Sequence, residues 1–153
     1  MAEVEVRVWQ LGRDSELKYV VILRDASERF LPIRIGPCEF SSISQTLLPK
    51  SASDGPWRPR AHDLICSLVE RMGARITKVV IDDLWDDVFF AQIHLSIDGK
   101  SLTVDARPSD AIAVALRSSA PLFCEGAVLA AAGESASSQR DGLDEFLDAS
   151  DLE

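Results

Sequence analysis

An internal repeat at a spacing of 71 residues constrains the fold of this chain more than any other feature of its sequence. Residues 31–39 (LPIRIGPCE) align with residues 102–110 (LTVDARPSD), and in both segments a proline is followed two positions later by an acid. The match extends over about residues 4–47 and 75–118. Two long repeats predict a duplicated supersecondary unit rather than a solenoid, whose repeats are shorter and more numerous.

Each repeat predicts three strands followed by a helix, because alternating apolar residues give way to apolar residues at helical spacing. The predicted strands are 4–8, 19–23, 30–35, 75–84, 88–97 and 101–105, and the predicted helices are 37–47 and 108–117. A further helix, 61–72, separates the repeats, and a short strand and a short helix are predicted at 121–123 and 125–132. We therefore expect an α+β domain with a mainly antiparallel, barrel-like sheet and helices packed on it.

The charge of the chain is unevenly distributed between a domain and a tail. The net charge is −9, and residues 134–153 hold seven acids and one arginine, so the first 133 residues carry only −3. We predict one domain over 1–133 and an acidic tail over 134–153, made of a linker and a brief helix at 143–147. Because the chain is acidic, any nucleic-acid contact needs a local basic site or is weak.

The ends and the cysteines predict a cytoplasmic protein without a membrane span. No apolar run reaches the roughly 18 residues that a membrane helix needs. The first residues alternate and include acids, unlike a signal peptide. Cys38, Cys66 and Cys124 match no zinc pattern, and we expect them to be reduced thiols.

The strand-to-helix corner in the second repeat is the first candidate site. Pro108 can begin a helix because its missing N–H would be unpaired there, and Asp110 then lies in the positively polarised first turn. The first repeat has Pro37 and Glu39 in the same places, so part of this pattern is helix capping. The repeat does not explain Asp105 and Arg107, because the first repeat has Arg34 and Gly36 in their places. That pair is therefore the part of the corner most specifically predicted to be functional.

Three blocks of the sequence resemble the bifunctional nuclease family (the BFN domain). They are residues 31–36 with Glu39, residues 58–64 (RPRAHDL), and residues 105–111 (DARPSDA) with Arg117 and Pro121. The resemblance covers about residues 4–132. It implies a compact α+β fold built on a duplicated unit, a homodimer, and an activity proposed to act on both RNA and DNA.

The residue types in these blocks suit phosphodiester hydrolysis. That reaction needs an activated water and relief of developing negative charge, which carboxylates with Mg²⁺ or Mn²⁺ and arginines can supply. The candidate acids and bases are Glu39, His62, Asp63, Asp105 and Asp110. The candidate phosphate ligands are Arg58, Arg60, Arg107 and Arg117. The candidate metal ligands for Mg²⁺ or Mn²⁺ are Asp105 and Asp110.

Each of these residues also has a structural interpretation. Asp105 and Arg107 can form a structural ion pair, Asp63 can stabilise a helix N-terminus, and Arg117 can stabilise a helix C-terminus. The acidic run 82–87 is interpreted as a solvated turn. The nuclease hypothesis therefore stands beside a non-catalytic binding or regulatory homodimer whose charged corner binds an anion, a ligand or a protein. The nuclease hypothesis predicts that the candidate residues converge on one solvent-reached cleft.

Overall fold

The structure, a computed structural model, describes residues 2–48, 56, 58–135 and 145–147. Its strands are β1 (Glu3–Arg13), β2 (Tyr19–Asp25), β3 (Phe30–Arg34), β4 (Ala74–Trp85), β5 (Val88–Ile97), β6 (Lys100–Ala106), β7 (Leu122–Glu125) and β8 (Glu145–Leu147). Its helices are α1 (Pro37–Leu47), α2 (Ala61–Arg71), α3 (Pro108–Ser118) and α4 (Gly126–Ala132).

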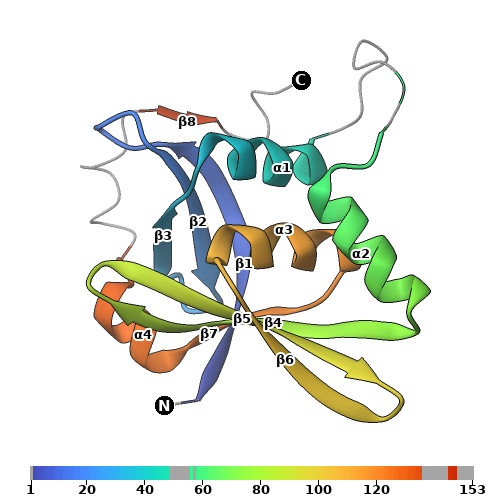
Figure 1. The fold of residues 1–153 in the computed structure, drawn as a ribbon. Coiled ribbons are helices and arrows are strands. Elements are labelled where there is room, and N and C mark those ends of the chain that lie inside the picture. Colours follow the sequence, from blue (N-terminus) through green and yellow to red (C-terminus); the bar gives the residue numbers. More distant parts are fainter. Residues whose placement is uncertain (1, 49–55, 57, 136–144, 148–153) are drawn as a thin grey trace.

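The strands form one sheet from two antiparallel halves, β1-β2-β3 and β4-β5-β6 (Figure 1). Between the halves lies β7, which pairs antiparallel with β1 and parallel with β4. The predicted mainly antiparallel α+β fold is confirmed. The barrel-like closure is not observed in the described residues, because β3 and β6 stand at the two ends of the strand order. The position of β3 fits Pro32, which cannot donate to a neighbouring strand.

The two repeats form elements in the same order, and their helices match in length. Both α1 and α3 are 11 residues long, both begin on a proline, and their bounds differ by the repeat spacing of 71. Each follows a three-stranded antiparallel meander. A common origin of the two halves stays a prediction, since matched elements alone do not test it.

The second of these helices, α3, is the centre of the core. Its residues 111–115 are at most 3% exposed. It contacts α1, α2, β4 and β5, and Figure 1 shows it between α1 and the β4-β5 part of the sheet. Because α3 is enclosed in this way, polar side chains at its N-terminus lie beside both of the other long helices.

The predicted helix at 143–147 is wrong for the described residues 145–147, which form strand β8. β7 covers only residues 3–6 of β1, whereas β8 pairs with residues 11–13. Pairing there satisfies backbone groups of β1 that β7 does not reach, and this tertiary gain overrides a weak helical pattern. The predicted linker falls mostly outside the described residues.

The predicted acidic turn over 82–87 is shorter than expected. β4 extends to Trp85 and β5 begins at Val88, so only Asp86 and Asp87 form the turn. Both have positive φ, at 51° and 61°, as a two-residue hairpin turn requires. Asp82 lies instead at an irregularity in the β4-β5 pairing.

The helix α2 leaves apolar side chains outside the core. Leu64, Ile65, Leu68 and Met72 follow helical spacing, yet they are between 40% and 70% exposed. Only the other side of α2, with Cys66 and Val69, packs against the core. No helix in the described part of the chain combines the length and apolar character needed to cross a bilayer.

Candidate functional site

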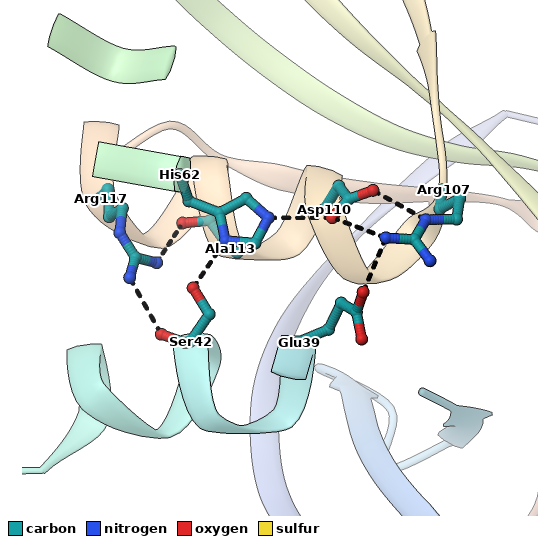
Figure 2. A network of polar contacts seen from close by, with 7 residues as sticks. All are labelled: Glu39, Ser42, His62, Arg107, Asp110, Ala113 and Arg117. Atoms are coloured by element: carbon teal, nitrogen blue, oxygen red, sulfur yellow. Dashed lines mark hydrogen bonds and ion pairs between the residues drawn. The ribbon is translucent and has the colours of Figure 1, made fainter. Parts of the chain in front are cut away.

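A continuous chain of polar contacts links α1, α2 and the N-terminus of α3. It consists of Glu39, Arg107, Asp110, His62 and Ser42, and we call it the polar chain (Figure 2). Figure 2 shows it running alongside α3, with Arg107 at one end and Ser42 at the other.

Arg107 is held by carboxylates from two helices. Its Nε donates to Oδ2 of Asp110 at 2.8 Å, and its Nη2 donates to Oε1 of Glu39 at 2.7 Å and to Oδ1 of Asp110 at 3.2 Å. The Arg107 side chain is nevertheless 66% exposed. Its Nη1 makes no hydrogen bond with the described residues, so two N–H groups are available to a ligand.

Glu39, Arg107 and Asp110 all lie at the N-termini of two matched helices. Arg107 is the N-cap residue of α3, and Asp110 and Glu39 each occupy the third position of a helix that begins on proline. Gly36 stands where the second repeat has Arg107. A Cβ at Gly36 would collide with Oε2 of Glu39, so the glycine leaves room for that carboxylate.

His62 joins Asp110 to α1 from inside the protein. Its Nε2 lies 2.9 Å from Oδ1 of Asp110, and its Nδ1 lies 2.6 Å from Oγ of Ser42. Both His62 and Ser42 are buried, and Ser42 is only 4% exposed. Ser42 was not among the residues that the sequence suggested. The available signal was its position three residues after Glu39, which places both on neighbouring turns of one helix face.

A second group of contacts ties the helices together nearby. Arg117 donates through Nε to Oδ1 of Asp63 at 2.8 Å, and to the backbone carbonyls of Ser42 and Ala113 at 3.1 Å each. Its side chain is only 7% exposed. Asp63 also accepts from the backbone N–H of Arg60 at 2.9 Å, as an N-terminal cap of α2. This group is placed to hold α1, α2 and α3 together rather than to meet a substrate.

The electrostatics of the polar chain follow from these contacts. Burial alone would raise the pKa of Asp110, but hydrogen bonds from Arg107 and His62 bring that pKa below its usual value. The pKa of Glu39 is lowered by its own backbone N–H and then by Arg107. The pKa of Arg107 is raised, first by Asp110 and then by Glu39. At neutral pH, the exposed end of the polar chain therefore holds two carboxylates and one guanidinium.

Asp105 lies outside the polar chain. It accepts a hydrogen bond from Nε2 of Gln92 on β5 at 3.3 Å, and it lines a cavity of about 540 Å³ together with Asp82, Asp83 and Arg107. Oδ1 of Asp82 is buried and has no hydrogen-bond partner among the described residues. Burial, followed by the charges of Asp83 and Asp105, raises the pKa of Asp82. Arg107 thus lies at the boundary between the polar chain and this cavity.

The structure therefore brings together some of the sequence candidates and separates others. His62, Asp110, Arg107 and Glu39 are connected, while Asp105 is directed to its neighbour on β5. In the described part of the chain, no group of three or more His, Cys, Asp or Glu side chains is placed to hold a metal ion.

The remaining two arginines lie near the start of α2. Nη1 of Arg60 donates to Oγ of Ser41 at 2.9 Å, which places Arg60 beside α1. Arg58 is exposed and makes no hydrogen bond or ion pair with the described residues. A tryptophan in a loop beside arginines is also a candidate for stacking on a base, and Trp57 is such a residue, but it falls outside the part of the chain that the structure describes.

The fold and the site define an α+β domain with an exposed, carboxylate-anchored arginine where three helices meet. The family model of the bifunctional nuclease domain matches residues 21–137. Because this match covers more than half of the 153 residues, the chain belongs to the bifunctional nuclease domain family.

Similar proteins include some that are named bifunctional nucleases and others that are named uncharacterized proteins. An uncharacterized protein of Mycobacterium tuberculosis is 41% identical over 115 residues, covering 74% of this chain and 66% of that protein. Bifunctional nuclease 1 of Oryza sativa subsp. indica is 28% identical over 115 residues, covering 72% of this chain and 34% of the rice protein. Bifunctional nuclease 2 of Oryza sativa subsp. japonica is 29% identical over 106 residues, covering 67% of this chain and 31% of that rice protein. The chain thus spans just under two thirds of the mycobacterial relative and about a third of the rice relatives.

Proposed function

We propose that this protein hydrolyses phosphodiester bonds of RNA, single-stranded DNA or both, with the substrate phosphate bound by Arg107. The observation that carries the proposal is the geometry of this arginine: exposed, fixed by two carboxylates, and with its Nη1 donors directed to no described residue. A guanidinium fixed in this way can bind a phosphate bidentately and stabilise the charge that develops on it. Family membership and the names of the rice relatives support the same chemistry.

The carboxylates beside Arg107 are the candidates for water activation. Glu39 and Asp110 are ionised at neutral pH and lie at the exposed end of the polar chain. Glu39 is the better placed of the two to accept a proton from an attacking water, because both oxygens of Asp110 already accept hydrogen bonds. His62 is mostly covered and has both ring nitrogens bonded within the protein. Arg58 and Arg60 are exposed just before α2 and are proposed to contact phosphates further along the bound nucleic acid. The net charge of −9 implies that binding is weak and falls with added salt.

A resident Mg²⁺ or Mn²⁺ held by Asp105 and Asp110 does not fit the contacts. Both oxygens of Asp110 accept hydrogen bonds from Arg107, and one also accepts from His62. Asp105 is engaged by Gln92 on the neighbouring strand. The dependence of cleavage on either ion stays a prediction, to be tested by adding Mg²⁺, Mn²⁺ or EDTA.

The test is cleavage of labelled single-stranded RNA and DNA at low salt by wild type, Arg107→Gln and Arg34→Gln. Arg34 is a matched control, since its side chain is 60% exposed and is held by Asp14 and Glu16 in a similar two-carboxylate arrangement. We expect Arg107→Gln to lose about 100-fold in kcat/KM, the usual cost of removing one charge-stabilising donor. Arg34→Gln should cleave like wild type. Equal activity of all three proteins would reject Arg107 as the phosphate ligand.

A second candidate function, a non-catalytic homodimeric binding or regulatory module, is favoured by the surface of α2. Leu64, Ile65 and Leu68 of α2, together with Met72 at its C-cap, are exposed apolar residues. The end strand β6 adds two more, Leu102 and Val104, which are about half exposed. A stable dimer buries roughly 1,200–2,000 Å² in total, and an apolar helix face can supply part of that area. We propose that the protein is a cytoplasmic homodimer, in keeping with its three free cysteines.

The oligomeric state tests this second proposal. Leu68→Glu should convert a dimer to a monomer in sedimentation or light-scattering measurements. Leu17→Glu is the matched control, because Leu17 is an exposed leucine in the turn between β1 and β2. A monomeric wild type, or a Leu68→Glu variant that stays dimeric, would exclude α2 as the interface.

A further inference from the structure

The buried end of the polar chain has no role in the proposed function so far. Ser42 and His62 are far less accessible than Arg107. His62 is nevertheless in direct hydrogen-bond contact with the Asp110 carboxylate that holds this arginine, and Ser42 hydrogen-bonds to His62. Oδ1 of Asp110 accepts hydrogen bonds from both His62 and Arg107. The position of the His62 ring therefore affects where the Asp110 carboxylate holds Arg107.

The hydrogen bonds fix which ring nitrogen of a neutral His62 carries the proton. Asp110 is ionised at neutral pH and can only accept, so its 2.9 Å contact requires the proton to be on Nε2. Nδ1 is then an acceptor, and the only group within hydrogen-bond distance of it in the described residues is the Ser42 hydroxyl, at 2.6 Å. That hydroxyl can rotate to donate to Nδ1.

These three residue types also form the catalytic triad of many hydrolases, but the arrangement here does not fit a serine nucleophile. Ser42 is 4% exposed, so a substrate cannot reach its oxygen. The free end of the arrangement is the carboxylate and its arginine, at the surface. The hydrogen bonds therefore connect the buried Ser42 hydroxyl, through His62 and Asp110, to the exposed Arg107 guanidinium.

We propose that Ser42 is a positioning residue, whose hydroxyl fixes His62 with Nε2–H directed at Asp110 and so fixes the carboxylate that holds Arg107. His62 then acts through Asp110 and not on the substrate. The effect on cleavage rests on the proposed function, in which Arg107 binds the phosphate. The positioning itself is a property of the folded protein and can be measured without a substrate.

The test is the tautomer of His62, read from two-bond ¹H–¹⁵N spectra of the labelled protein at pH 8. The chain has only two histidines, so a His94→Gln variant assigns both sets of signals. We expect wild type to show a protonated Nε2 and an unprotonated Nδ1 for His62. A protonated Nδ1 in neutral wild-type His62 would overturn the proposal directly, with no variant needed.

Two variants then separate the Ser42 hydroxyl from the other serines of α1. Ser42→Ala leaves Nδ1 without its donor, so the ¹⁵N signal of Nδ1 should move toward that of an imidazole nitrogen that accepts no hydrogen bond, and kcat/KM should fall between about tenfold and 100-fold. Ser44→Ala is the control on the same helix, since its hydroxyl bonds only to the Ser41 carbonyl, and it should change neither readout. An unchanged Nδ1 signal in Ser42→Ala would also overturn the proposal. If wild type cleaves nothing, the nuclease proposal fails while the spectra still decide the role of Ser42.

Discussion

Gly36→Ala tests whether the Glu39 carboxylate anchors Arg107. The backbone at Gly36 has φ −77° and ψ 164°, which alanine adopts without strain. The added Cβ meets only Glu39, chiefly its Oε2. Because that atom ends a flexible side chain, we expect Glu39 to swing away while the fold persists. Arg107 would then keep its two contacts with Asp110 and lose its 2.7 Å contact with Glu39.

The expected change in stability is small, because two effects oppose each other. An ion pair with an arginine this exposed stabilises by no more than about 1 kcal/mol. Replacing glycine by alanine at a compatible position stabilises by about 0.4–1 kcal/mol through the unfolded state. The free energy of unfolding should therefore change by less than about 1 kcal/mol, which corresponds to a Tm shift of at most about 4 °C. Cleavage, in contrast, should fall if Glu39 belongs to the site.

The assay is an NMR titration of the Glu39 carboxyl beside thermal unfolding. In wild type its pKa is lowered by its own backbone N–H and by Arg107, so displacement of the side chain should raise that pKa toward its ordinary value. Gly133→Ala is the control, because there a Cβ would collide with the backbone carbonyl oxygen of Leu129, which cannot swing away. That control should be clearly more destabilised. An unchanged pKa of Glu39 in Gly36→Ala would refute the reasoning.

Three further predictions concern stability and reactivity. The pKa values of Asp63 and Asp110 are lowered in the folded state, so these groups stabilise the fold above roughly pH 4, and urea unfolding should show that stability being lost as the pH falls below it. Flat stability between pH 6 and pH 2 would contradict this. Arg117→Met should cost about 3 kcal/mol in the same assay, because it removes a buried cation and leaves Asp63 without its charged partner; a loss below about 1 kcal/mol would mean that this pair is dispensable. A thiol reagent should modify the exposed Cys38 in the native protein but not Cys124, because Cys124 is buried and its burial raises the pKa of its thiol to about 12. Mass spectrometry of the labelled peptides measures this, and faster labelling of Cys124 than of Cys38 would contradict the prediction.

The helices and strands depend mainly on local sequence, which is why most of them could be predicted. The proline at position 37 and the one at 108 begin helices where the repeat indicated. The dipeptide Asp98-Gly99 is typical of a tight hairpin turn, and it forms one with φ of 51° and 74°. The α2 helix was also predicted from its apolar spacing. That spacing determines a helix but not what covers its faces, so the exposure of Leu68 and its neighbours was not predictable.

The site depends on residues that are far apart in the sequence. Residue types singled out Glu39, His62, Arg107 and Asp110, but only the packing of α1 and α2 against α3 brings them into one chain of hydrogen bonds. Ser42 carried no signal of its own, because a serine on a helix face becomes functional only through the neighbour it meets.

The sequence by itself determined the repeated strand and helix pattern, the helix starts and the charged corner, since all of these arise from neighbouring residues. Tertiary structure decided which partners each residue of that corner contacts. Asp105 and Arg107 are two residues apart and would share a face of one strand, but β6 ends at Ala106 and Arg107 becomes the N-cap of α3. The chain changes direction between them, so Asp105 stays beside Gln92 while Arg107 joins Glu39 and Asp110.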